Sequence, residues 1–178
     1  MSNKISIYLI IKDHLGTLTN HSSGKLDLFD HFVQFIVPLL LCVIYYFYCP
    51  NFGSGVGSNI DQAIVAAFSI FTALLFNLQI MIMGLLDKPL ELIVPESENE
   101  VLNHKKKERK QNFIRQIFYN ISFAVLISIS LVTISIVLVF FGGTEWVFTK
   151  VIEIFLVSHF LVVGLMILKR THSLFSQM

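Results

Sequence analysis

Four long apolar blocks dominate this sequence and leave few folds open to it. They run over about residues 32–48, 61–86, 118–141 and 146–168. An α-helix rising about 1.5 Å per residue needs roughly 17 to 25 such residues to cross about 30 Å of hydrocarbon. Because 54% of the chain is hydrophobic and only 14% is charged, a water-soluble domain of this size would have an apolar surface. We therefore predict an all-α integral membrane four-helix bundle.

The placement of basic residues predicts the orientation of these spans. Seven of the thirteen Lys and Arg residues lie between the second and third blocks, three precede the first block, and two follow the fourth. The opposite side has only Lys150, just inside the fourth block. Cytoplasmic loops of membrane proteins carry an excess of Lys and Arg. We expect both termini and the loop at 87–117 in the cytoplasm.

The polar segments divide the chain into two regions, 1–25 and the four-span domain 26–178. Within 1–25, helical spacing places five apolar residues on one face: Ile7, Tyr8, Ile11, Leu15 and Leu18. Such an amphipathic helix either lies flat on the membrane or packs on the cytoplasmic ends of the spans. Both interpretations remain open from the sequence.

The basic loop contains a helix-start signal. Pro95 precedes a Ser97 to Glu100 capping box, and no Gly or Pro follows until Gly142. The third helix is thus predicted to begin near Glu98 and to extend into the cytoplasm as a stalk, about 65 Å long in all. The alternative is a short basic helix broken from the span near Phe113. The predicted partner-binding residues are Lys105, Lys106, Lys107, Arg109 and Lys110.

This basic tract suits anionic lipid headgroups, a cytosolic protein or nucleic acid. Direct binding of nucleic acid is disfavoured, because the tract has no aromatic residues on which bases could stack. If the stalk holds the tract farther from the membrane than a Debye length of roughly 8 to 10 Å, salt screens its attraction to lipid headgroups, and a protein partner is favoured.

Polar residues inside the apolar blocks are candidates for function, since they are costly in hydrocarbon. They are Asn77, Gln79, Lys150, Glu153 and His159. Lys150 and Glu153 are three residues apart and can pair. Glu153, about 10 Å below Trp146, is expected within reach of water. For His159, the sequence favours a packing hydrogen bond over a proton relay or a gate.

Amides at such depth form hydrogen bonds between helices, so we expect this of Asn77, Gln79 and Gln34. Pro38 lies inside the first span and frees one backbone carbonyl, which a neighbouring helix or side chain must satisfy. In the second span, the pairs Ala63/Ala67 and Ser69/Ala73 permit close approach of another helix. Together with the scattered amides, they predict a homo-oligomer.

Neither an enzymatic motif nor a metal-ligand cluster occurs, and Cys42 is interpreted as a small apolar filler. We predict no catalysis and no cofactor or metal site. Two functional hypotheses follow: a membrane scaffold or sensor that recruits a cytosolic protein through the stalk, and an oligomeric pore or channel. The Ser and Thr residues of the third span spread around the helix rather than forming a stripe, which weakens the pore hypothesis.

Three segments carry a resemblance to a known group of proteins: 11–18 (IKDHLGTL), 35–39 (FIVPL) and 68–77 (FSIFTALLFN). They resemble small four-span proteins of bacterial anti-phage loci, and in particular the membrane component of Kiwa-type two-protein systems. The resemblance implies an oligomer of the bacterial inner membrane that senses phage attack and holds a cytosolic, DNA-binding effector. It carries over no functional residue. Other four-span defence proteins that permeabilise the membrane are similar as well.

Overall fold

A computed structural model describes residues 7–18, 28–48, 57–86, 100–141 and 147–176. Within these ranges, the side chains of 28–29, 57–60, 100–107, 109 and 173–176 are not described. The described chain is entirely helical, with α1 (Ile7–Gly16), α2 (Leu28–Tyr48), α3 (Gly57–Leu86), α4 (Glu100–Phe141) and α5 (Val147–Ser176). The predicted all-α class is confirmed.

Helices α2 to α5 are long and apolar enough to cross a membrane, which indicates a multi-pass membrane protein. The qualifying segments are Asp30–Tyr48, Asp61–Leu86, Lys110–Phe141 and Val147–His172. They coincide with the four apolar blocks and extend most of them by a few residues. Their outer faces carry exposed Leu, Ile, Val and Phe side chains along most of their length. Such surfaces suit lipid, since hydrocarbon solvates them without cost.

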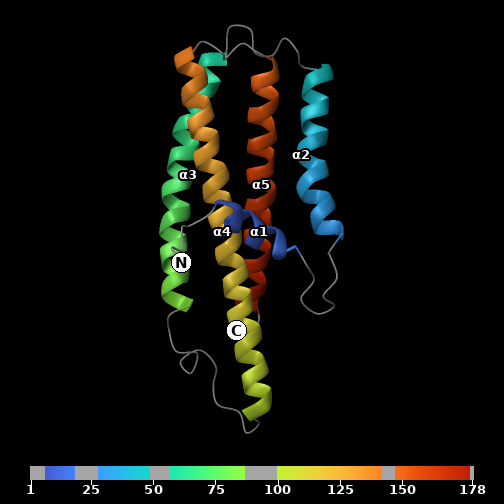
Figure 1. The fold of residues 1–178 in the computed structure, drawn as a ribbon, viewed down its shortest axis with the longest axis vertical. Helices are drawn as coiled ribbons and strands as arrows, with labels where there is room; N and C mark the ends of the chain where they lie inside the picture. Colours follow the sequence, from blue (N-terminus) through green and yellow to red (C-terminus); the bar gives the residue numbers. More distant parts are fainter. Residues whose placement is uncertain (1–6, 19–27, 49–56, 87–99, 142–146, 177–178) are drawn as a thin grey trace.

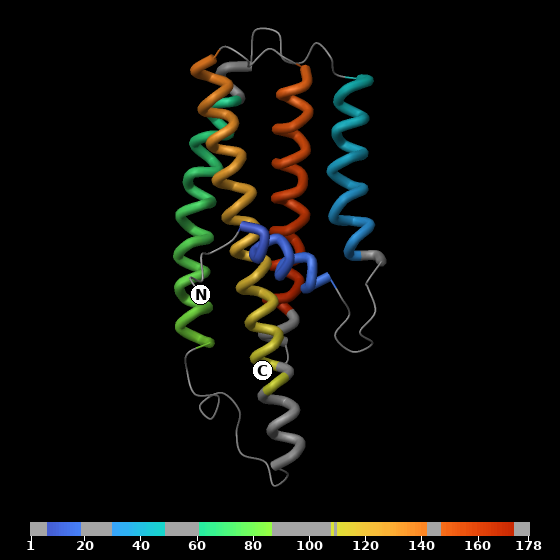
Figure 2. Tube along the Cα trace, in the orientation of Figure 1, coloured from blue at the N-terminus to red at the C-terminus, as the bar shows by residue number. Residues whose placement is uncertain are grey.

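The four long helices form an open row rather than a closed bundle. Helix α3 packs on α4, α4 packs on α5, and α5 packs on α2 (Figures 1 and 2). Within the described residues, α2 and α3 make no comparable contact with each other, so the row has two edges. The predicted number of four spans is therefore confirmed, whereas the helices are arranged in an open row and not in the predicted bundle.

The core lies where α3, α4 and α5 meet. Ile121 and Leu131 of α4 and Val163 of α5 are inaccessible, and Phe68 of α3 packs edge-on against Phe160 of α5, with ring centroids 4.9 Å apart. Edge-to-face pairs of this kind stabilise by about 0.5–1.5 kcal/mol beyond the area they bury. Most of the apolar packing thus holds three helices together, while α2 is attached to α5.

Helix α4 is continuous from Glu100 to Phe141. Its 42 residues span about 63 Å at 1.5 Å per residue, twice the hydrocarbon thickness. The alternative with a break near Phe113 is wrong, since the helix passes through this position without interruption. The capping box before Glu100 lies outside the described residues. In Figure 1, α4 continues past the ends of the neighbouring helices.

Helix α1 lies across α4 and α5 (Figure 2). Four of its predicted face residues are exposed: Ile7, Tyr8, Ile11 and Leu15. The fifth, Leu18, was assigned to the wrong face, because the helix ends at Gly16 and Leu18 is buried. The two interpretations of this helix, lying flat on the membrane and packing on the spans, therefore do not exclude each other. It packs on the spans through one face and leaves its apolar face uncovered.

The small residues of α3 face away from the other helices of the chain. Ala63, Ala67, Ser69 and Ala73 are exposed, whereas α3 meets α4 through Phe68, Thr72 and Gln79. The small pairs of α3 therefore do not serve as a close contact with another helix of this chain.

Candidate functional site

The centre of the first polar site is His14 of α1, whose side chain is inaccessible. Its Nδ1 lies 2.8 Å from the side-chain oxygen of Asn120 in α4, and its Nε2 contacts the amide nitrogen of Gln34 in α2. Since the oxygen of Asn120 can only accept, Nδ1 carries the proton and Nε2 accepts from Gln34. The imidazole also stacks on Phe123, with ring centroids 3.9 Å apart. One side chain of α1 thus binds two spans.

Thr17 and Arg170 add a third span to this site. The hydroxyl of Thr17 lies 2.7 Å from the carbonyl of His14 and 2.8 Å from the side-chain oxygen of Asn120. Nη2 of Arg170, near the end of α5, donates to the Thr17 carbonyl at 2.7 Å. Helix α1 is therefore tied by polar contacts to α2, α4 and α5. We call His14, Thr17, Gln34, Asn120, His159 and Arg170 the α1 cluster.

His159 satisfies the backbone group that Pro38 leaves free. Pro38 has no N–H, so the carbonyl of Gln34, four residues earlier, lacks its helical partner. Nδ1 of His159 in α5 donates to this carbonyl at 3.1 Å. The prediction that the carbonyl freed by Pro38 takes a donor from a neighbouring helix is confirmed. The packing hydrogen bond that the sequence favoured for His159 is the same contact and is confirmed as well. The imidazole is enclosed by Phe35, Phe123 and Phe155.

Burial determines the charge state of His14. Removal from water lowers its pKa to about 4, and the charges of His159 and Arg170 act in the same direction, while the bonds from Asn120 and Gln34 oppose the shift. The imidazole is therefore neutral at pH 7, which matches a ring that donates through one nitrogen and accepts through the other. His14 therefore adds no charge to the α1 cluster at pH 7, and the fixed cation of the cluster is Arg170.

The second polar site joins α3, α4 and α5, and we call its residues Asp61, Ser135, Lys150 and Glu153 the lysine cluster. Nζ of Lys150 lies 3.0 Å from Oε2 of Glu153, which confirms the predicted pair, and it also contacts Oδ1 of Asp61. The hydroxyl of Ser135 donates to Oε1 of Glu153 at 2.9 Å. Glu153 is only 2% exposed, so the expectation that it reaches water was wrong.

The two clusters lie at opposite ends of the spans. Asn120 and Ser135 are fifteen residues apart on α4, which corresponds to about 22 Å along the helix axis. A hydrocarbon layer of about 30 Å centred between them would cover both. Polar contacts therefore connect the helices on both sides of the middle of the spans, and the part between the two clusters is held mainly by apolar packing.

Between the clusters, short polar contacts join α3 to α4. The hydroxyls of Thr72 and Ser128 lie 2.6 Å apart, and the amide nitrogen of Gln79 donates to the Ser122 hydroxyl at 3.1 Å. The interhelical bond predicted for Gln79 is confirmed. The same prediction for Asn77 was wrong within this chain, because its side chain is exposed.

Residues 105–109 of the basic tract lie on the part of α4 that precedes its candidate span, and Lys110 is the first residue of that span. Among the five basic residues of the tract, the structure describes the side chain of Lys110 alone, which is half-buried. The backbone of Lys105, Lys106, Lys107 and Arg109 is helical, and their side chains lie outside the described part. The structure therefore places the tract on the helix that carries Asn120, ten residues further along.

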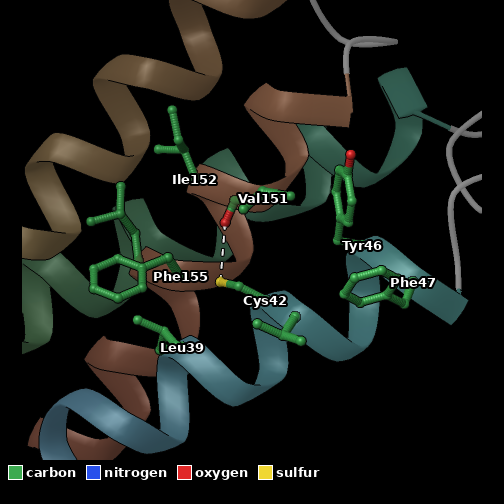
Figure 3. A pocket seen from close by; sticks show the side chains of 9 residues that line it. Leu39, Cys42, Tyr46, Phe47, Val151, Ile152 and Phe155 are labelled. Carbon is green, nitrogen blue, oxygen red and sulfur yellow. Dashed lines mark hydrogen bonds between the residues drawn. The ribbon is translucent and has the colours of Figure 1, made fainter.

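An apolar hollow of about 440 Å³ lies between the C-terminal half of α2 and the N-terminal half of α5. Leu39, Cys42 and Tyr46 of α2 face Val151 and Phe155 of α5 across it (Figure 3). The thiol of Cys42 donates to the Val151 carbonyl at 3.4 Å, and its burial agrees with the predicted filler role. The hollow offers hydrocarbon contacts and hardly any polar group.

Sequence reasoning missed several residues of these sites. His14, Thr17, Asn120 and Arg170 were not among the predicted site residues, and Asp61 was treated only as the start of a span. The sequence does contain a signal for His14, because Ile10 and Leu18 lie four residues before and after it and helical spacing therefore places this polar residue on an apolar face. For Asn120 and Asp61, only the tertiary contacts reveal a role. Comparison with family models, with curated proteins and with solved structures finds no match for this chain.

Proposed function

We propose that this protein is a scaffold or sensor of the bacterial inner membrane that holds a cytosolic effector on the basic tract of α4. The observation that carries the proposal is the continuity of α4, which joins the tract 105–110 to Asn120 without a break. Asn120 is also the residue to which His14 and Thr17 bind. A change in how α1 is seated would therefore act on the helix that presents the tract.

The extension of α4 beyond its span presents the basic tract to the cytoplasm in the proposed topology. Ten residues, 100–109, precede the span that begins at Lys110, and they add about 15 Å of helix. The basic residues 105–109 lie within about 8 Å of Lys110 along the helix axis, which is within one Debye length, so distance from the span does not exclude anionic headgroups as a second contact. Five basic residues within six positions suit an acidic surface on a cytosolic protein.

The exposed small face of α3 supports self-association. Ala63, Ala67, Ser69, Ala73 and the amide of Asn77 are all exposed in a segment that the proposal places in the bilayer. An amide in hydrocarbon is stabilised by a partner on another helix, and small residues permit close contact of backbones. The protein that we propose is accordingly a homo-oligomer with α3 at its subunit contact.

The anti-phage role rests on the resemblance to four-span proteins of defence loci. A membrane sensor with a cytoplasmic rod fits such a role, because phage DNA enters through the inner membrane. Both termini and the segment 87–117 are proposed to be cytoplasmic.

The partner experiment replaces all five basic residues of the tract with Gln in the full chain. Cells also express the soluble product of the adjacent gene, and the readouts are its co-purification and the plating efficiency of a phage panel. The wild type should recover the partner and reduce plaque formation, and the tract variant should lose at least tenfold of the recovery. Lys12→Gln, Arg115→Gln and Lys169→Gln together form the control, since these exposed basic residues lie outside the tract.

Unchanged partner recovery by the tract variant would contradict the role of the basic tract. Equal plaque formation with and without the wild type would contradict the defence role. Entry of a membrane-impermeant dye on infection would instead favour the pore hypothesis.

Orientation is tested with a single cysteine placed in 87–99, in a chain without Cys42 and Cys49. A membrane-impermeant maleimide should label it only after the inner membrane is opened, and labelling of intact spheroplasts would refute the proposed topology.

A further inference from the structure

Helix α1 buries polar side chains and exposes apolar ones. His14 and Thr17 are 0% and 4% exposed where α1 packs on the spans. The large apolar side chains that α1 leaves uncovered are 37% to 68% exposed: Ile7, Tyr8, Leu9, Ile11 and Leu15. We call these five residues the outer surface of α1. A helix on the surface of a soluble protein has the opposite pattern, with its apolar side chains on the core and its polar ones in water. The outer surface of α1 is therefore suited to hydrocarbon.

The anchors of α1 lie within the candidate spans. Gln34 and Asn120, which contact His14, belong to Asp30–Tyr48 and Lys110–Phe141. Asn120 and Ser135 are about 22 Å apart along α4, so a hydrocarbon layer of about 30 Å centred between them places Asn120 about 4 Å inside its edge. Helices that lie in a membrane interface bury their apolar face roughly 5–10 Å into the boundary between headgroups and acyl chains. The depth of α1 agrees with such a position.

The direction of α1 agrees with it as well. The helix runs across α4 and α5 and not along them (Figure 2). Since these long helices cross the membrane, the axis of α1 lies near the membrane plane, as in interfacial helices. The exposed Lys12 suits this position, because the apolar stem of a lysine can lie along acyl chains while its ammonium reaches the headgroups.

Exposed apolar side chains of the spans continue this surface at the same depth. Phe32, two residues before Gln34 in α2, is 58% exposed, and Leu168, two residues before Arg170 in α5, is 66% exposed. Gln34 and Arg170 are the residues through which α2 and α5 hold α1. The outer surface of α1 therefore adjoins the part of the spans that hydrocarbon already surrounds. A second copy of the chain is not needed to cover it, since the proposed self-association uses α3.

We propose that the outer surface of α1 binds the acyl chains of one membrane leaflet, at the level of the headgroup boundary. The apolar side chains of α1 lie among the chains, and Lys12 extends to the lipid phosphates. The contact connects the leaflet to α4, because His14 and Thr17 of the same helix hold Asn120. This inference goes beyond the proposed scaffold role. It depends only on the four long helices crossing a bilayer.

The first test places a fluorescent reporter on the outer surface. Tyr8→Trp is made in a Trp146→Phe background, which removes the single native tryptophan. The full chain is reconstituted in nanodiscs of phosphatidylcholine with ordinary or brominated acyl chains, and iodide is the quencher in water. Leu165→Trp in the same background is the matched control, because Leu165 is 66% exposed within the span of α5. Brominated chains should quench both reporters to within about a factor of two, and iodide should quench neither strongly. Ile11→Trp is a second reporter on α1.

The second test places a charge on the same surface. Leu15→Glu should expose the amides of α1 to hydrogen exchange at pH 8 in nanodiscs, about tenfold or more faster than in the wild type, because a carboxylate among acyl chains is costly. Leu15→Met is the matched control and should exchange as the wild type does. Leu, Met and Glu have similar helix propensities, so the intrinsic stability of α1 is nearly the same in all three chains. The amides around Ile121 of α4 should not change in either variant.

The proposal requires both results. Reporters on α1 that are quenched by iodide and not by brominated chains would show that the outer surface faces water, and this overturns the proposal. Reporters quenched by neither would show that protein covers the surface, for example a second copy, and this overturns it equally. Unchanged protection of α1 in Leu15→Glu has the same consequence.

Discussion

Acidification should release α1 from the spans through His14. This residue is inaccessible, and its burial lowers its pKa to about 4, against an ordinary value of 6.5. Between these two values the released state binds a proton that the docked state does not, so docking weakens as the pH falls. Docking is complete above pH 6.5 and is lost progressively toward pH 4. Between these pH values the free energy of docking α1 weakens by about 1.4 kcal/mol per pH unit, which amounts to roughly 3 kcal/mol in total.

Hydrogen exchange measures this effect directly. The amides of α1 should be protected at pH 7 in nanodiscs and should lose protection on acidification, once corrected for the intrinsic exchange rate. A loss of about 3 kcal/mol corresponds to roughly a hundredfold or more in the opening equilibrium. The amides of α4 around Ile121, in the core, should change little.

His14→Gln is the matched control, because its amide can donate to Asn120 and accept from Gln34 but does not titrate in this range. It leaves His159 and Arg170 in place, so any pH response that persists belongs to other groups. The reasoning is refuted if α1 of the wild type keeps the same protection from pH 7 to pH 4, or if the Gln variant responds equally.

Three further predictions concern the spans. His159→Phe should lower the free energy of unfolding, measured by steric trapping, by about 1–3 kcal/mol, because it leaves the Gln34 carbonyl without a donor. The loss should be smaller in a Pro38→Ala background, where the alanine restores the helical N–H donor to this carbonyl. Equal losses in the two backgrounds would contradict the argument that Pro38 frees the carbonyl. Gln79→Leu should cost about 0.5–1 kcal/mol in the same assay through its interhelical bond, and no change would show that this bond adds nothing. Asn77→Leu should change the free energy of unfolding of the monomer by less than about 0.5 kcal/mol but weaken self-association in a crosslinking series. A strongly destabilised monomer would instead show that this amide makes its contacts within one chain.

The spans were predictable because a bilayer imposes a length and a polarity on each crossing segment. The four apolar blocks reappear as candidate spans, and the absence of Gly and Pro before Gly142 correctly indicated one continuous α4. The carbonyl freed by Pro38 was predictable for the same reason, since hydrocarbon provides no hydrogen-bond donor. These features depend on local sequence and on the solvent alone.

The polar sites were predictable only in part. Lys150 and Glu153 lie on one helix face, so their pair follows from helical spacing. The contact of Lys150 with Asp61 spans 89 positions, and that of His14 with Asn120 spans 106. No periodicity relates residues so far apart in the chain. Helix spacing also does not distinguish Gln79, which meets α4, from Asn77, which is exposed.

What the sequence determined by itself is the medium, the helical class and the number of spans, because each follows from the free energy of transferring segments out of water. The order of the helices in an open row, the packing of α1 on the spans and the contact of Lys150 with Asp61 were decided by the tertiary structure. They depend on which helix faces meet, and in lipid the apolar surface of one helix hardly differs from that of another. Small numbers of buried polar side chains, together with the fit of the packed surfaces, therefore select the arrangement.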